Sequence, residues 1–331
     1  MKKITIILLL CTVLTGLSAE NQQNELTIYT YDSLSWIEKN LVKSFEQTNH
    51  CRVKVVKFEN SSKIISRLIF EKRKNVADIA VGITPSMLIK AKKNKIVADY
   101  KSGNISAIKD KSLIFDREFY CTPFDFGALA VIYDPAKFKK TPESFDDILK
   151  MENSIIIQDP RTSSTGTDFL FWTIAKYGDG WENFWEKFSR SVLTAAPGWT
   201  ESFSKFENGE APMMVSYATD GAYSMENYKS SKYKAFIPDN EGFIQIEGVS
   251  IVKNAPNRKL AEKWIDFMLS DQFQKEIPLN QWMFPVTSVA LPDVYKYAVT
   301  PQKILSLDAS VIEKNQEKWL KSWVKIMKNK K

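Results

Sequence analysis

The stretch Ser154-Ile-Ile-Ile-Gln-Asp-Pro-Arg-Thr-Ser-Ser-Thr-Gly-Thr167 combines a strand, a loop and the start of a helix. Three β-branched residues, Ile155 to Ile157, predict a short buried strand, which Asp159-Pro160 ends. The small residues Ser163 to Gly166 then lead into the apolar run Phe169 to Trp172, which predicts a helix. This order of elements indicates an α/β fold.

The start of this predicted helix has two interpretations. Ser163 or Ser164 can cap the helix by accepting hydrogen bonds from its first backbone N–H groups. Alternatively, the free N–H groups and the positive end of the helix dipole can bind an anion such as a phosphate or carboxylate. For such a stretch taken alone, the cap is the better-supported interpretation.

The same alternation of strand and helix extends through the rest of the chain. Strands are predicted at 26–29, 53–58 and 77–81, with helical faces after each, as a parallel sheet with covering helices requires. A second α/β unit contains the opening stretch and a strand at 212–217. We therefore predict a chain of mixed α/β class with two units.

Two extended segments join these units. The segment 119–127 is interrupted by Pro123 and Gly127, which fits a connector better than a central strand. The segment 242–252 is long enough to cross back. The prediction is a hinged pair of α/β lobes, with lobe 1 formed by residues 20–123 and about 248–331, lobe 2 by 124–247, and a cleft at the hinge. The last helices of the chain are predicted to span both lobes.

The N-terminus has the pattern of a secretory signal. Met1-Lys2-Lys3 precedes the apolar run 4–14, and Leu17-Ser18-Ala19 precedes polar residues. We predict a signal peptide over residues 1–19 and export from the cytoplasm. Cys11 follows Leu10, where a lipoprotein signal needs a small residue, so a lipid anchor is disfavoured.

Charge, cysteine and histidine content restrict the function. The net charge is +7, but much of it lies in the last helix, where a solvated face is a better explanation than nucleic-acid binding. Cys51 and Cys121 are either a disulfide or two free thiols. His50 is the only histidine in the chain, which excludes most histidine-rich metal sites.

Aromatic and small polar residues follow the predicted strands. In open α/β sheets the residues beyond the carboxyl ends of the strands contact ligands. Rings presented from both lobes suit a flat ligand, especially a cation, because the ring face is negative. The candidate binding residues are Tyr31, Trp36, Asn60, Ser61, Ser163, Ser164, Trp199, Tyr217, Asp220, Tyr223 and Trp282.

Several blocks resemble those of a known family. Examples are the segments 26–33, 123–127 and 158–163, which reads Gln-Asp-Pro-Arg-Thr-Ser, together with 282–286, which reads Trp-Met-Phe-Pro-Val. They resemble the periplasmic thiamine-binding proteins, substrate-binding components of ABC importers within the class of two-lobed extracellular solute-binding proteins. The resemblance covers nearly all of the chain beyond the signal.

This resemblance implies a function and a set of contacts. The chain is expected to have a type II periplasmic-binding-protein fold and to capture thiamine, and thiamine mono- or diphosphate, in the periplasm. It would deliver the ligand to an ABC permease, as a monomer without a cofactor or catalysis. Tyr31 and Tyr223 would sandwich the aminopyrimidine ring, and Trp36 and Trp282 would enclose the thiazolium ring. The hydroxyethyl end or its phosphate would lie against Ser163, Ser164, Trp199 and Tyr217.

Two positions depart from the family pattern. Asn60-Ser61 stands where the family tends to have Asp-Gly, and Asp220 adds a carboxylate. If Asp220 faces the ligand, it favours the thiazolium cation and disfavours a phosphate.

Two other functions remain as alternatives. In a thiaminase-like enzyme, Cys121 would act as nucleophile with Glu241 or Glu247 as its base. The other alternative, an iron(III) carrier, is disfavoured because Tyr217 and Tyr223 are not adjacent and the single histidine is remote.

Overall fold

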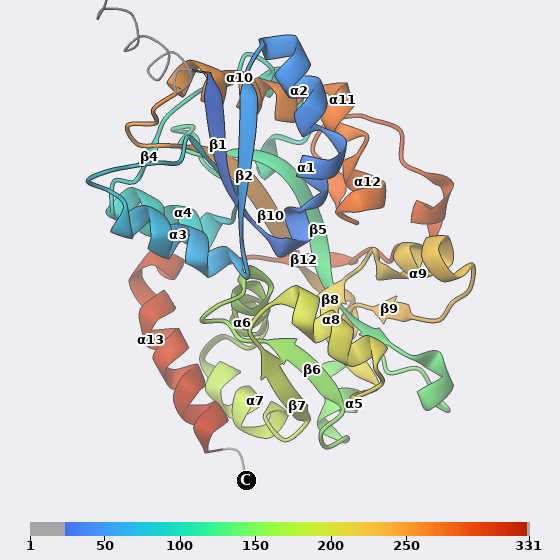
Figure 1. Ribbon diagram of the computed structural model, residues 1–331. Coiled ribbons are helices and arrows are strands. Elements are labelled where there is room, and N and C mark those ends of the chain that lie inside the picture. The colour runs from blue at the N-terminus through green and yellow to red at the C-terminus, as the bar shows by residue number, and fades with distance from the viewer. Residues whose placement is uncertain (1–23, 330–331) are drawn as a thin grey trace, which may run out of the picture.

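The computed structural model describes residues 24–329, so the predicted signal peptide and Cys11 lie outside the described residues. The chain forms two α/β lobes, one above the other in Figure 1. The strands make one continuous sheet in the order β2-β1-β3-β10-β5-β8-β6-β7. No helix within residues 24–329 is long and apolar enough to cross a membrane.

The first lobe is built on the three parallel strands β2, β1 and β3 at one edge of the sheet. Leu26 and Ile28 of the first strand are completely buried, which explains why this strand lies inside the sheet. The elements of this lobe are β1 (Glu25–Tyr31), α1 (Trp36–Asn40), α2 (Val42–Asn49), β2 (Arg52–Phe58), α3 (Ser61–Phe70), β3 (Ile79–Ile83), α4 (Pro85–Lys93), β4 (Val97–Ala98), α10 (Arg258–Met268), α11 (Asp271–Gln274) and α12 (Ile277–Asn280).

The second lobe contains the opening stretch of the sequence. The predicted strand is β6, which pairs in parallel with β7 and β8, and the predicted helix is α6. Its elements are α5 (Phe145–Leu149), β6 (Ile155–Gln158), α6 (Ser164–Tyr177), α7 (Trp181–Phe188), β7 (Val192–Ala196), α8 (Trp199–Glu207), β8 (Met213–Tyr217), α9 (Asp220–Tyr228) and β9 (Lys234–Phe236).

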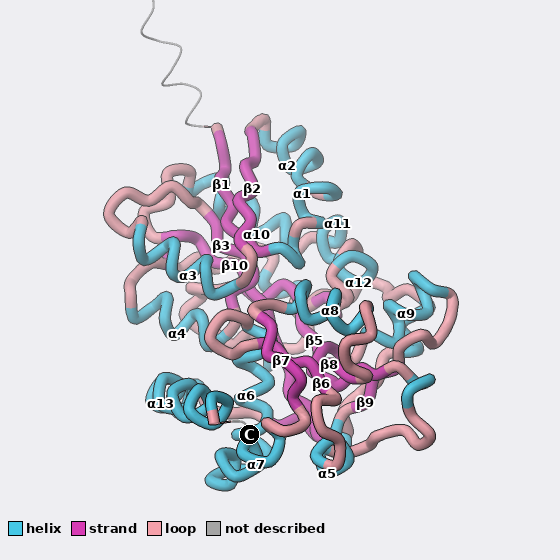
Figure 2. Tube along the Cα trace, turned by 60° about the horizontal axis from the view of Figure 1, so that its bottom comes forward, coloured by secondary structure: helices cyan, strands magenta, loops and turns pink. Residues whose placement is uncertain are grey.

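Two strands of twelve residues each, β5 (Thr122–Tyr133) and β10 (Glu241–Val252), pass from one lobe to the other. They pair antiparallel with each other, and β10 pairs with β3 while β5 pairs with β8. Figure 2 shows them in the middle of the strand layer. Two short strands, β11 (Phe284–Pro285) and β12 (Lys303–Leu305), are added to β5 and β10 respectively.

These crossing strands correct two predictions. The segment around Pro123 and Gly127 is part of one unbroken central strand, not an interrupted connector. Pro123 is tolerated because it lies opposite Gly248, where the register shifts and the ladder is already irregular. The sheet is also mixed rather than parallel, because the two crossing strands run in opposite directions.

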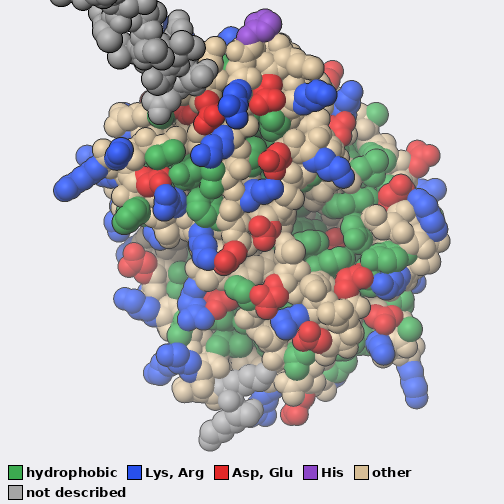
Figure 3. All heavy atoms as spheres, viewed as in Figure 1, with side chains coloured by type: hydrophobic (Ala, Val, Ile, Leu, Met, Phe, Trp, Pro, Cys, Tyr) green, Lys and Arg blue, Asp and Glu red, His purple; other side chains and the backbone are tan. Residues whose placement is uncertain are grey.

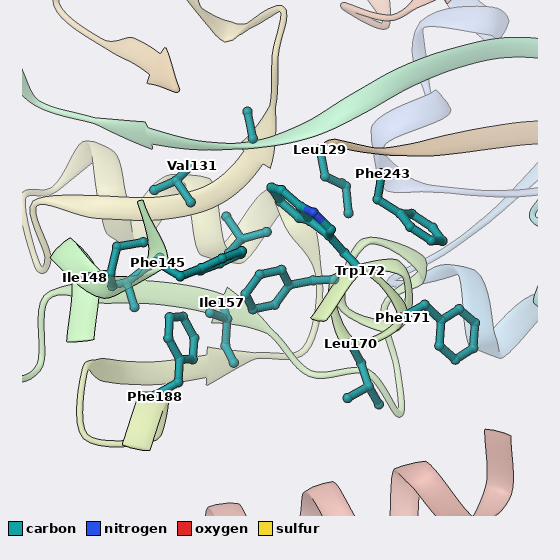
Figure 4. Close-up of a cluster of buried hydrophobic side chains, with 14 of the residues drawn as sticks. Leu129, Val131, Phe145, Ile148, Ile157, Leu170, Phe171, Trp172, Phe188 and Phe243 are labelled. Carbon is teal, nitrogen blue, oxygen red and sulfur yellow. The ribbon is translucent and has the colours of Figure 1, made fainter. Parts of the chain in front are cut away.

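Each lobe has its own apolar core. In the second lobe, Phe145 and Trp172 pack edge to face with ring centroids 5.3 Å apart, beneath Leu129 and Val131 of β5 (Figure 4). In the first lobe, Trp264 of α10 packs against Phe45 of α2 at 4.8 Å. Aromatic pairs of this kind stabilise a core beyond the area they bury. Two separate cores allow the lobes to behave as units.

The last helix, α13 (Ala309–Lys328), lies along the second lobe (Figures 1 and 2). Trp323 packs on Trp185 of α7 and Trp319 on Phe171 of α6, both at 5.8 Å. The helix also contacts α4 of the first lobe. The lobe boundaries in residue numbers stay a prediction.

Candidate functional site

A cavity of about 310 Å³ lies between the two lobes. Figure 3 shows its mouth as a recess flanked by hydrophobic side chains. Its size is within the usual range for small-molecule sites. All eleven candidate residues from the sequence line it: Tyr31, Trp36, Asn60, Ser61, Ser163, Ser164, Trp199, Tyr217, Asp220, Tyr223 and Trp282.

The strand ends explain why these residues meet. Tyr31 is the last residue of β1, Tyr217 is the last of β8, and Asn60 follows β2 by two positions. Their strands come from both lobes, and the carboxyl ends of these strands point to the same gap. Trp36, by contrast, begins α1, and Trp282 lies in the loop after α12.

The N-terminus of α6 forms both a cap and a contact between the lobes. The Ser163 hydroxyl accepts a hydrogen bond from Gly166 N–H at 3.4 Å, so the cap interpretation is confirmed. The N–H of Ser164 donates to the hydroxyl of Ser61, from the other lobe, at 3.1 Å. Two of the N–H groups at this helix end therefore already have acceptors within the chain.

Asn60 and Asp220 are also engaged by the backbone. Asn60 caps α3 by accepting from Lys63 N–H at 3.3 Å. The Asp220 carboxylate accepts from Tyr217 N–H at 3.3 Å, and burial raises the pKa of this carboxyl to about 6. Both side chains line the cavity while holding the local backbone.

Aromatic rings form much of the wall. Trp199 stacks on Phe203 at 4.8 Å, and its indole N–H donates to the Ser216 hydroxyl. Trp282 meets Tyr223 edge to face at 5.2 Å. Tyr217 shares a 2.9 Å hydrogen bond with Thr165 across the floor of the second lobe.

Trp282 has an unusual backbone conformation. Its φ angle of +59° is left-handed, which is costly for a bulky side chain. The loop is held by Tyr295, whose hydroxyl donates to the carbonyl groups of Pro278 and Met283 at 2.8 and 2.9 Å. Thr219 of the other lobe donates to the Trp282 carbonyl. Such a maintained strain is typical of functional sites.

Tyr31 is held by Gly82, which packs against its ring, and by Glu247, which accepts a hydrogen bond from its hydroxyl. A Cβ at Gly82 would lie 2.4 Å from the ring, so only glycine allows the ring to lie there. The Tyr31 hydroxyl donates to the buried Glu247, and burial, with the charge of Glu247, raises the pKa of Tyr31 well above its usual value. Tyr31 is therefore a neutral ring at physiological pH.

A hydrogen-bonded chain runs from the wall to Glu247. The Trp36 indole N–H donates to Gln281 at 2.8 Å, and the Gln281 amide donates to Glu247 at 3.3 Å. Sequence reasoning did not select Gln281 or Glu247 as binding residues. The sequence feature that could have identified Glu247 is a charged residue within the buried, mostly apolar strand β10.

The electrostatic character of the cavity is acidic. Among the described residues that line it there is no lysine, arginine or histidine, whereas Asp32, Glu59 and Asp220 are present. Aromatic faces add negative potential. The arrangement suits a flat organic cation better than an anion.

The cysteine and the histidine considered for the alternative functions lie outside the cavity lining. Cys121 does not line the cavity, is only 1% exposed, and burial raises the pKa of its thiol to about 12. It is a free thiol, as is Cys51. His50 is exposed at the end of α2. This geometry does not support a thiolate nucleophile at Cys121.

Residues 31–275 match the model of the bacterial extracellular solute-binding protein family, and the chain belongs to this family. Solved structures agree with this class. The fold alone is shared with AfuA from Actinobacillus pleuropneumoniae, at a TM-score of 0.79 and 19% identity over 92% of this chain and 99% of that one.

Within this class, the chain is similar to thiamine-binding periplasmic proteins. It is 34% identical to that of Brucella melitensis over 92% of this chain and 93% of the relative. It is 30% identical to that of Escherichia coli over 98% of both chains. A solved periplasmic thiamin binding protein has a TM-score of 0.85 at 29% identity, covering 92% of this chain and 96% of that one. The resemblance seen in the sequence is confirmed.

Proposed function

We propose that this protein is the extracytoplasmic component of an importer and captures thiamine between its two lobes. The observation that carries the proposal is the convergence of aromatic rings from both lobes on a cavity whose described lining has no basic side chain. Thiamine has two flat heterocycles and a permanent positive charge, so it complements this lining. The similarity to thiamine-binding periplasmic proteins supports the same ligand.

The proposed contacts follow the cavity wall. Tyr31 and Tyr223 stack on the aminopyrimidine ring, and Trp36 and Trp282 enclose the thiazolium ring. The hydroxyethyl end lies near Ser163 and the N-terminus of α6. Closure is a population shift, because contacts made with both lobes exist only in the closed state. The capture needs no cofactor and no catalytic step.

Thiamine itself is the preferred form in this proposal. A phosphate would lie among Asp32, Glu59 and Asp220 without a basic partner from the described lining, and two N–H groups of α6 are already engaged. Electrostatic repulsion and the cost of removing the phosphate from water then oppose its binding. We expect thiamine monophosphate and diphosphate to bind more weakly than thiamine.

The remaining partners are part of the same proposal. We infer a periplasmic location, with residues 1–19 removed as a signal peptide, and delivery to an ABC permease. The ligand-bound protein acts as a monomer, since both halves of the site come from one chain.

The test is a calorimetric titration of the refolded chain, freed of co-purified ligand, with thiamine and its two phosphates. We expect one site per chain, a Kd of micromolar or below for thiamine, and quenching of tryptophan fluorescence. Tyr120→Phe, which alters a tyrosine outside the cavity, is the control and should leave the Kd unchanged. Absence of binding by all three compounds at micromolar concentration would refute the proposal.

A further inference from the structure

Two acidic residues face each other on the crossing strands. Asp125 of β5 and Glu247 of β10 are direct cross-strand partners in the antiparallel ladder. Partners of this kind project to the same face of a sheet. Their exposed fractions are 0% and 1%. Two buried carboxyl groups therefore lie side by side at the hinge.

This pair lies behind the floor of the cavity. Glu247 accepts hydrogen bonds from Tyr31 and Gln281, and both of these side chains line the cavity. Gly127, two residues after Asp125, lies under Met283 and Tyr217, which also line it. The alternate residues Phe126 and Ile246 face the other side of the sheet.

The pair lacks a basic partner. No lysine, arginine or histidine forms an ion pair with Asp125 or Glu247 within residues 24–329, and neither oxygen of Asp125 has a hydrogen-bond partner there. An isolated buried carboxylate is expensive unless it is protonated or paired. The titratable groups that interact with the pair are Tyr31, Tyr217, Tyr295 and Asp168, all neutral or acidic, and Asp220 lies beyond Tyr217 and Tyr295.

We propose that Asp125 and Glu247 provide the counter-charge for the cationic ring of the ligand, and that capture of this cation releases a proton from the pair to solvent. The inference rests on the proposed thiamine-binding function and names the residues that select a cation. Before binding, one of the two carboxyl groups holds a proton, which lessens the repulsion between them. The ligand's charge replaces that proton, and no other bond changes.

The electrostatics of the pair agree with this exchange. Burial raises the pKa of Glu247 to about 7, and burial together with the charge of Glu247 raises the pKa of Asp125 well above its usual value. A cation in the cavity favours the ionised form and lowers both pKa values. The Kd of a cation should then fall as the pH rises from about 5 to 7, by at most tenfold per pH unit for each proton released.

The experiment measures protons directly. Thiamine is titrated into the refolded full chain at pH 6.5 in two buffers of different ionisation enthalpy, and the difference in heat gives the number of protons released. We expect a clear fractional release for the natural chain. Uptake of a proton by the ligand's aminopyrimidine ring on binding would have the opposite sign.

Variants identify the source of the proton. Glu247→Gln should bind thiamine at least tenfold more weakly, with less proton release and a flatter pH profile. Asp125→Asn should likewise weaken thiamine binding, reduce the proton release and flatten the pH profile. Asp78→Asn is the matched control, because Asp78 is also a buried carboxyl group but lies at the opposite end of the β1–β3 ladder. It should retain the proton release.

The outcomes separate the two proposals. If thiamine does not bind at all, the proposed function fails, and this inference fails with it. If thiamine binds without releasing a proton, or if both variants keep the natural release and affinity, only the counter-charge role is refuted. The measurement on the natural chain needs no variant, so misfolding of Glu247→Gln does not prevent a decision.

Discussion

The two faces of the hinge ribbon formed by β5 and β10 differ in an unexpected way. Toward the ligand cavity the ribbon presents Asp125, Gln245 and Glu247, and all three are buried. Toward the opposite side it presents Phe126 and Ile246, which are partly exposed and line a second cavity of about 440 Å³. In most sheets the apolar face is the buried one.

The burial of polar residues on the cavity face, in place of apolar ones, lowers the folding stability at the position where we propose that the ligand binds. Burying carboxyl groups without basic partners costs free energy that an apolar pair would not. Neither side-chain amide atom of Gln245 has a hydrogen-bond partner within the described part of the chain either. The face that is unfavourable for stability is the one beneath the ligand cavity. The comparison therefore assigns ligand binding to this face and structural support to the opposite face.

The largest effect on thiamine binding should come from Tyr31, which lines the cavity next to Glu247. Tyr31→Ala removes a ring and exposes the buried Glu247, and we expect at least a 100-fold higher Kd for thiamine, or about 3 kcal/mol. Phe126→Leu on the opposite face should change the Kd by less than threefold. Calorimetry on both variants, with circular dichroism as a folding check, tests this. Equal losses would show that the two faces do not divide the roles as described.

The second effect concerns the pH dependence of stability without ligand. The pKa of Glu247 is about 7 in the folded chain and about 4.3 in the unfolded chain, so the folded state binds more protons between these values. The free energy of unfolding should therefore fall as the pH rises through this window, by up to roughly 4 kcal/mol.

Urea denaturation of the ligand-free chain at pH 5 and pH 7.5 measures this difference. Glu247→Gln should reduce it. Glu241 opposes this trend only at lower pH, because Lys176 and Lys303 hold its pKa at about 2 and its contribution is lost as the pH falls from about 4. A natural chain that is more stable at pH 7.5 than at pH 5 would contradict the prediction.

A third effect tests the support of Tyr31. Gly82 has a φ angle of +90°, and a Cβ there would collide with the Tyr31 ring. Gly82→Ala should reduce stability by about 1 to 3 kcal/mol and weaken thiamine binding by displacing the ring. Gly103→Ala is the matched control, since a Cβ at Gly103 has nothing within 4 Å. Denaturation midpoints and Kd values of the two variants should differ clearly, and similar values would argue against a support role for Gly82.

The smallest effect should come from the contact between the lobes. Ser61→Ala removes the acceptor for Ser164 N–H, at a cost of about 1 kcal/mol, which corresponds to about fivefold weaker binding if the bond belongs to the closed state. Ser66→Ala, on the exposed face of the same helix, is the control. An unchanged Kd for Ser61→Ala would show that the bond does not favour closure.

Most of the fold could be predicted from the chain itself. The β-branched run Ile155 to Ile157 is β6, the following apolar run lies in α6, and Ser163 is its cap. Most of the candidate residues line one cavity because they follow the carboxyl ends of strands, a rule that depends only on element order, whereas Trp36 and Trp282 come from α1 and a loop. The continuity of β5 through Pro123 and Gly127 was missed, because it depends on a register shift in the partner strand.

The sequence alone therefore determined the elements, their alternation and the residues at the strand ends, because these follow from local periodicity and turn chemistry. Only the tertiary structure decided that Asp125 and Glu247 meet, although they are far apart in the chain. Their meeting depends on the pairing and register of two long strands. In a buried setting that pairing changes which protonation state each carboxyl group adopts, and no local pattern contains this information.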